Sequence, residues 1–302
     1  MKIKKSKADI LADILIYALI AALSIICLIP FIHVAAMSIS SDASVYANKV
    51  WLIPKDITLN AYKTVLGDPS MMHSLGYTVI ITALFTALGM FLTICAAYAL
   101  SRKRLKGRKV FNIMFLITMY FSAGIIPDYI LMSNLNLLDT TAVLVLPLAI
   151  SAYNMIILRT AMQGIPVELE EAAQIDGCSD FRILVQIMLP LCVPTLATLA
   201  LFYAVGRWNS FQDALYYINK PELQPLQLKL YNLVNASGSN ASLSQEAGGG
   251  ENQAAEVVKS ATIMFATIPI IIVYPFVQKY FVSGVMIGAV KAVSYTHLTL
   301  PT

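Results

Sequence analysis

The chain has 302 residues, of which 58% are hydrophobic and 13% are charged, and its formal net charge is +4. Because a soluble domain usually carries about 25% charged residues, this composition argues against a globular protein in water and predicts a bilayer as the solvent. The basic residues fall in short clusters rather than on one broad face, so nucleic-acid binding is not expected.

Six runs without Asp, Glu, Lys or Arg follow one another along the chain. Each run is about 17 to 28 residues long, which is enough for a helix to cross a hydrocarbon core of roughly 30 Å. We therefore predict an all-α polytopic membrane protein with six transmembrane helices in one domain, residues 1–291. The expected spans are residues 12–38, 74–100, 110–131, 140–159, 184–206 and 260–280.

Lysines and arginines in the short loops predict the orientation of these spans. Four lysines lie within residues 2–7, and "SRKRLKGRK", between the second and third spans, has six basic residues in nine. The next connection, "LMSNLNLLDT", has none. We expect both termini, the basic loop and the acidic segment 165–186 to lie in the cytoplasm.

The last outer segment, residues 207–259, contains a stretch rich in Gly, Ser and Asn, which favours a flexible loop. It is either a solvated connection or a contact surface for an outer partner.

The cores of the six predicted spans hold no Asp, Glu, Lys or Arg, the residues that usually couple transport to ions or protons. Energy for uphill transport would then enter from outside the membrane, although a passive channel or a scaffold fits equally well. The sequence contains no phosphate-binding G-x-x-x-x-G-K-[ST], H-E-x-x-H or G-x-S-x-G motif. We expect no enzymatic activity, no cofactor and no metal site.

The acidic segment "IPVELEEAAQIDGCSDFRI" predicts a short helix, a turn and a second helix. Pro166 suits a first helical turn, and three glutamates follow it where the helix dipole favours negative charge. Gly177 can adopt the left-handed conformation that ends a helix, and Ser179 or Asp180 can cap the next one. Two interpretations stay open from these residues: a solvated connector, or a docking surface for a partner.

The same segment resembles the EAA motif of ABC importer permeases, E-A-A-x3-G-x9-I-x-L-P. Every defined position of the pattern is matched with its spacing, by Glu171, Ala172, Ala173, Gly177, Ile187, Leu189 and Pro190. In that family the motif forms the coupling helices that sit in a cleft of the ATP-binding subunit. The resemblance implies the same role here.

Further stretches resemble carbohydrate permeases of the MalG-like branch, and within it the LplC/YtcP type, over about residues 8–291. They include "FSAGIIPDYILMSNLNLLDT", "LALFYAVGRWNSFQDALYY" and "GVMIGAVK". The resemblance implies a type I importer fold in a bacterial plasma membrane and an oligosaccharide substrate. It also implies a second homologous permease, two copies of a cytoplasmic ATP-binding subunit and an extracellular solute-binding lipoprotein as partners. Residues 292–302 depart from the family pattern, and we interpret them as a non-native tail.

Aromatic, hydroxyl and amide side chains near the span ends are the candidates for sugar contacts. Ordinary packing or an interfacial aromatic belt is the alternative for each. The candidates are Tyr120, Phe121, Ser122, Tyr153, Asn154, Tyr203, Trp208 and Asn209.

Overall fold

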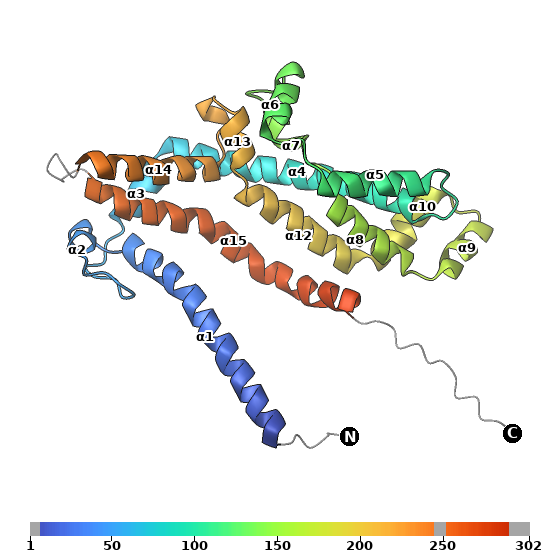
Figure 1. The fold of residues 1–302 in the computed structure, drawn as a ribbon, viewed down its shortest axis with the longest axis horizontal. Coiled ribbons are helices and arrows are strands. Elements are labelled where there is room, and N and C mark those ends of the chain that lie inside the picture. The colour runs from blue at the N-terminus through green and yellow to red at the C-terminus, as the bar shows by residue number, and fades with distance from the viewer. Residues whose placement is uncertain (1–6, 245–251, 290–302) are drawn as a thin grey trace. The chain divides into compact units, whose positions relative to one another are not determined.

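A computed structural model describes residues 7–244 and 252–289, and within these ranges the chain forms helices and connecting segments without a strand (Figure 1). The all-α prediction is therefore confirmed. The chain divides into two compact units, residues 1–75 with 226–268 and residues 76–225 with 269–302. The predicted tail, 292–302, lies outside the described residues.

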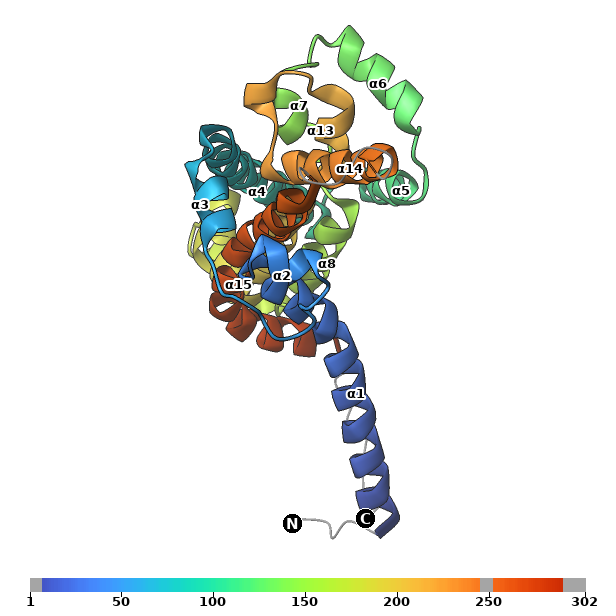
Figure 2. The ribbon, with the colours of Figure 1, turned by 90° about the vertical axis from the view of Figure 1, so that its left-hand side faces the viewer.

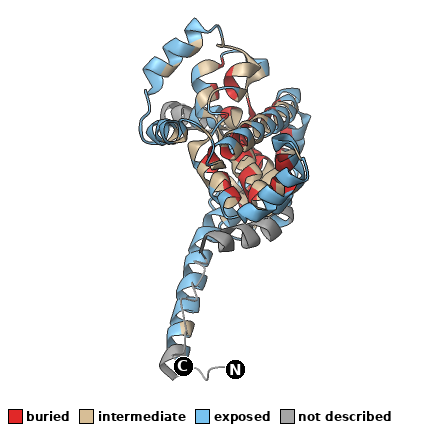
Figure 3. Ribbon diagram, turned by 90° about the vertical axis from the view of Figure 1, so that its right-hand side faces the viewer, coloured by how far each residue is buried: buried red, intermediate tan, exposed pale blue. Residues whose placement is uncertain are grey.

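The first unit contains a long apolar helix and a small packed cluster. Its elements are α1 (Lys7–Ser38), α2 (Asp42–Tyr46), α3 (Asn60–Gly67), the start of α4 (Pro69–Ser101), α14 (Leu226–Ser244) and the first part of α15 (Asn252–Ala289). Ala61 and Val65 of α3 pack against Val257 and Ala261 of α15. The apolar helix α1 is exposed along nearly all its described length (Figure 3). An apolar helix with this exposure is suited to contact with lipid or with other protein surfaces.

The second unit holds the rest of α4 and a series of shorter helices. They are α5 (Arg108–Tyr120), α6 (Ile125–Asn134), α7 (Thr141–Val145), α8 (Ala152–Gln163), α9 (Val167–Ile175), α10 (Asp180–Ile183), the π-helical turn η1 (Leu184–Met188), α11 (Leu189–Leu191), α12 (Val193–Asn209), α13 (Gln212–Tyr217) and the 3-10 turn η2 (Pro221–Leu223). The core of this unit joins Ala97 and Leu100 of α4 to Leu158 of α8, Ala173 of α9 and Leu199 of α12. Helix α13 contacts α6 and α7, and the three gather at one end of the unit (Figure 2).

Among the described residues, three continuous helices are long and apolar enough to cross a membrane, and up to five spans result if each of two bent helix pairs counts as one. The continuous ones are Ile10–Ser38, Pro69–Ser101 and Glu256–Pro275. The pair α5 and α6 bends by 115°, and the pair formed by Asp180–Leu191 and α12 bends by 85°. The structure does not confirm six continuous spans.

The expected fourth span, residues 140–159, differs most from the prediction. Instead of one helix, the chain forms α7 of 5 residues and α8 of 12 residues. The break contains Pro147, which cannot donate a backbone hydrogen bond, and Leu148 with a φ of 60°. At 1.5 Å per residue α8 is about 18 Å long, which is too short to cross the bilayer alone. An uncharged run therefore did not guarantee a continuous helix.

The expected outer loop 207–259 contains helices within the described residues, although the Gly-, Ser- and Asn-rich stretch in it favoured a flexible loop. Residues 212–217 form α13, and α14 continues to Ser244. Leu226 and Leu228, at the start of α14, are buried. Their packing outweighs the loop-like composition that begins a few residues later, and residues 245–251 lie outside the described part.

Candidate functional site

The acidic segment folds as the expected helix, turn and second helix. Helix α9 ends at Ile175, and Gly177 has a φ of 77°, in the left-handed region predicted for it. The Ser179 side chain accepts a hydrogen bond of 3.4 Å from the backbone N–H of Arg182 and so caps α10. One detail differs, since Pro166 is the N-cap of α9 rather than a residue of its first turn.

The EAA-motif residues divide between an inward and an outward side. Ala173 is buried in the core of the second unit, and Ile187 and Leu189 pack against that core. Glu171, Ala172, Gly177 and Pro190 are exposed. A Cβ atom added to Gly177 would meet nothing within 4 Å, so the turn has open space in front of it.

Pro190 also shapes the backbone behind the motif. Its ring removes an amide donor and crowds the preceding turn, which accounts for the π-helical turn η1 just before it. The short helix α11 follows, and Cys192 separates it from α12. The ILP part of the motif therefore marks the bend between the helix–turn–helix element and the membrane helix α12.

Two large apolar side chains lie on either side of the motif's turn. Ile175 is 87% exposed and Phe181 is 74% exposed. Such side chains are costly to leave in water and are common at the centres of protein interfaces. Sequence analysis missed both, although two apolar residues beside a turn in a polar segment are a usable signal.

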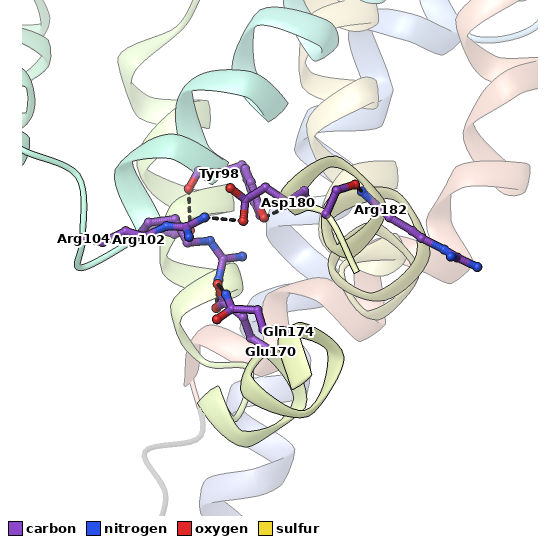
Figure 4. Close-up of polar contacts among 9 residues, drawn as sticks. Tyr98, Arg102, Arg104, Glu170, Gln174, Asp180 and Arg182 are labelled. Carbon is purple, nitrogen blue, oxygen red and sulfur yellow. Dashed lines mark hydrogen bonds and ion pairs between the residues drawn. The ribbon is translucent and has the colours of Figure 1, made fainter. Parts of the chain in front are cut away.

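Basic residues just after α4 form ion pairs with this element (Figure 4). Arg102 pairs with Glu170 of α9, and Arg104 pairs with Asp180 of α10. Burial lowers the pKa of Arg102 below its ordinary value, whereas the hydrogen bond with Asp180 raises the pKa of Arg104. The sequence analysis used these arginines for orientation and did not predict their partners.

A cavity of about 750 Å³ lies elsewhere in the second unit, beside the broken segment between α7 and α8. Tyr153, Asn154 and Tyr203 line it, as do Phe85 and Leu148. The other five candidates for sugar contacts are not among its lining residues: Tyr120, Phe121, Ser122, Trp208 and Asn209. Trp208 is buried, and the Asn209 side chain donates to the Val205 carbonyl over 2.9 Å.

An ion pair that the sequence analysis missed lies in the cavity wall. The Arg207 guanidinium is buried and pairs with the Asp213 carboxylate, with one contact of 3.2 Å from Nη2 to Oδ1. Arg207 also donates to the Leu144 carbonyl over 3.0 Å. The only sequence signal was its position at the end of an uncharged run. These bonds connect the end of α12 to α13 and α7.

The hydroxyl of Tyr203 joins three helices around the same cavity. It accepts a hydrogen bond of 2.9 Å from the backbone N–H of Ser151 and lies 2.7 Å from Oγ1 of Thr93. A Cβ atom added to Gly89 of α4 would come within 2.8 Å of the Tyr203 ring. Tyr203 therefore holds α12 close to α4 and to the start of α8.

The sequence and the fold match one family of membrane proteins. Residues 89–287 match the family model described as the inner membrane component of binding-protein-dependent transport systems. The chain belongs to this family. It is a permease subunit of the ABC importer type and a multi-pass membrane protein.

Two curated relatives from Bacillus subtilis (strain 168) are similar over nearly their whole length. One, a polygalacturonan/rhamnogalacturonan transport system permease protein (YtcP), is 41% identical over 93% of this chain and 98% of the relative. The other, protein LplC, is 39% identical over 95% of this chain and 97% of the relative. A solved bacterial ABC transporter involved in import of the acidic polysaccharide alginate has a chain with a TM-score of 0.83 and 35% identity, covering 93% of this chain and 100% of that one.

Proposed function

We propose that this chain is the permease subunit of an ATP-driven importer that carries an oligosaccharide across a bacterial plasma membrane. A cytoplasmic ATP-binding subunit drives it by docking on the element formed by α9, Gly177 and α10. The observation that carries the proposal is the exposed motif surface, in which Glu171 and Ala172 lie next to an open glycine turn. Ile175 and Phe181 give that surface an apolar contact area suited to a partner's cleft.

In the orientation that the sequence predicts, this surface faces the cytoplasm. The basic loop after α4 is predicted to be cytoplasmic by its lysines and arginines. Its pairs with Glu170 and Asp180 keep the docking element on the same side. Both termini lie on that side in the predicted topology.

The oligosaccharide passes along the cavity beside the α7–α8 break. Irregular backbone at membrane depth is tolerated where it lines a cavity, and the break at Pro147 and Leu148 lies in this cavity's wall. Tyr153 and Tyr216 offer exposed aromatic faces for sugar rings, and Asn154 offers an amide. One relative is named as a polygalacturonan/rhamnogalacturonan transport permease, and the solved transporter is involved in import of the acidic polysaccharide alginate. Acidic, uronate-containing oligosaccharides are therefore the first substrates to test.

The importer is completed by the other subunits that the family resemblance implies. A second homologous permease completes the pathway, two ATP-binding subunits dock from the cytoplasm, and an extracellular solute-binding lipoprotein delivers the sugar. ATP binding and hydrolysis then favour different arrangements of the permease pair. A ligand shifts such an equilibrium only through its differential affinity for the two states, and the docking element is where that difference would act.

The test is co-purification of the ATP-binding subunit together with ATP-dependent uptake in proteoliposomes. Glu171→Lys and Ile175→Asp are expected to reduce both, because the first reverses a charge in the docked surface and the second replaces an apolar contact with a carboxylate. Glu222→Lys is the matched control, since this exposed glutamate lies in η2, away from the motif.

Loss of binding and uptake in the two docking variants, with a normal control, supports the proposal. Unchanged binding and uptake in both docking variants would show that this element is not the coupling surface. Sugar flux without ATP or a binding protein would instead indicate a facilitator, and ATPase binding without any flux would indicate a scaffold.

A further inference from the structure

The ion pair of Arg102 and Glu170 is mostly shielded from solvent, unlike the neighbouring pair of Arg104 and Asp180. The Arg102 side chain is 10% exposed and the Glu170 side chain is 17% exposed. The Nε and Nη2 atoms of Arg102 are buried without a hydrogen-bond partner among the described residues. Glu170 therefore supplies an ion-pair partner for a mostly buried positive charge.

A second set of contacts ties the other half of the docking element to the same helix end. The Tyr98 hydroxyl donates to the Asp180 backbone carbonyl over 2.9 Å, and Arg104 pairs with the Asp180 carboxylate. The Arg102 guanidinium lies 4.2 Å from the centre of the Tyr98 ring. Residues on both sides of the Gly177 turn are thus attached to the last turn of α4 and the residues just after it (Figure 4).

These two attachments differ in how strongly they depend on their partners. Arg104 and Asp180 are more than half exposed, and an exposed pair contributes little. Removing one partner of a buried pair is strongly unfavourable, because it leaves a charge uncompensated. Of the two ion pairs, the pair of Arg102 and Glu170 is therefore the one whose loss would loosen α9 from α4 more.

Helix α4 leads from this contact to the cavity. Phe85, which lines the cavity, precedes Arg102 by 17 positions in the sequence, or about 25 Å along a helix. Residues 85 to 101 belong to one uninterrupted helix, α4. Displacement of its end by the docking element would thus be carried to the cavity wall.

We propose that Arg102 and Glu170 form a latch that transmits movement of the ATPase-docking element to the cavity through α4. The inference rests on the proposed function and adds a role for two residues outside the EAA motif. They act as positioning residues: the latch binds neither the ATPase nor the sugar, and it couples movement of the docked ATPase to movement of the cavity wall. Breaking it leaves the ATP-binding subunit attached and hydrolysing ATP, while sugar uptake per ATP falls.

The experiment reverses the charges of the latch in the complete reconstituted importer. The variants are Arg102→Glu, Glu170→Arg and the double swap, with Glu170→Gln as a mild change of similar shape. Lys106→Glu is the matched control, because it makes the same charge change at an exposed lysine of the same loop. Three quantities are measured: bound ATPase, ATP hydrolysis rate and sugar taken up per ATP.

We expect each single reversal to lower uptake per ATP by about tenfold, in the range of ordinary coupling energies, with ATPase binding retained. The double swap should restore most of the loss, Glu170→Gln should lie between, and the control should match the wild type. Unchanged uptake per ATP in Glu170→Gln and the single reversals would overturn the latch. A double swap that is folded yet as uncoupled as the single variants would overturn it as well. Failure of the wild-type chain to bind the ATPase would instead refute the proposed function.

Discussion

Replacing Tyr203 by Phe separates a packing role for this residue from a role in binding sugar. The substitution removes one oxygen and leaves the ring in place, so the effect comes from lost hydrogen bonds. The Ser151 N–H loses its 2.9 Å acceptor at the broken start of α8, whereas the Thr93 hydroxyl can turn to a carbonyl of its own helix. One buried unsatisfied donor costs about 1–3 kcal/mol, and we expect ~2 kcal/mol here.

The assay is thermal unfolding of the purified subunit in detergent, together with uptake in the reconstituted importer. A loss of ~2 kcal/mol corresponds to an apparent Tm lower by roughly 4–8 °C. Tyr153→Phe is the control for the Tm measurement, because Tyr153 lines the same cavity and its hydroxyl makes no hydrogen bond among the described residues. A Tyr203→Phe variant with an unchanged Tm but weaker uptake would refute the packing argument and assign the hydroxyl to the sugar.

Two further predictions concern the docking turn and the outer surface. Gly177→Ala should lower the free energy of unfolding by about 1–2 kcal/mol and weaken ATPase association, because a φ of 77° is unfavourable for Ala. Gly177→Asn should have a smaller effect, because Asn tolerates this conformation better. Equal ATPase binding by both variants and the wild type in a pull-down would contradict this prediction. Asp139 accepts the backbone N–H groups of Asn219 and Lys220, and the Asn219 bond is the main cause of its lowered pKa. The stabilisation from the Asp139 carboxylate exists above the ordinary Asp pKa and is lost as pH falls through the lowered value. The two amides should therefore keep their protection from hydrogen exchange between pH 7 and pH 5. In Asp139→Ala their exchange should be faster at both pH values.

Local features of the docking element were predictable because short-range chemistry determines them. Gly177 in the left-handed region and Ser179 as a cap follow from conformational preferences within a few residues. The contact of Arg102 with Glu170 joins residues 68 positions apart, and charge counting cannot choose among the several acids available. Long-range pairing of this kind depends on how α4 and α9 meet in the folded core.

The sugar-contact candidates show a second limit. Adjacent residues on a helix point in directions about 100° apart. Selecting Trp208 because it is aromatic and lies near a span end therefore does not reveal that its neighbour Arg207 lines the cavity. Tyr120 and Phe121 lie at the sharp bend between α5 and α6, which hydropathy alone did not predict. Composition indicates which segments are apolar, and it gives little information on breaks within them or on which side of a helix lines a cavity.

The break between α7 and α8 also bears on how the chain is made. Its backbone groups need protein or water partners, because an exposed N–H in lipid is costly. The Ser151 N–H finds its acceptor on Tyr203, which is synthesised 52 residues later. Residues 146–151 therefore cannot complete their hydrogen bonding when they first leave the ribosome. During biosynthesis this segment must stay at the insertion machinery, or in a hydrated site, until α12 has arrived beside it.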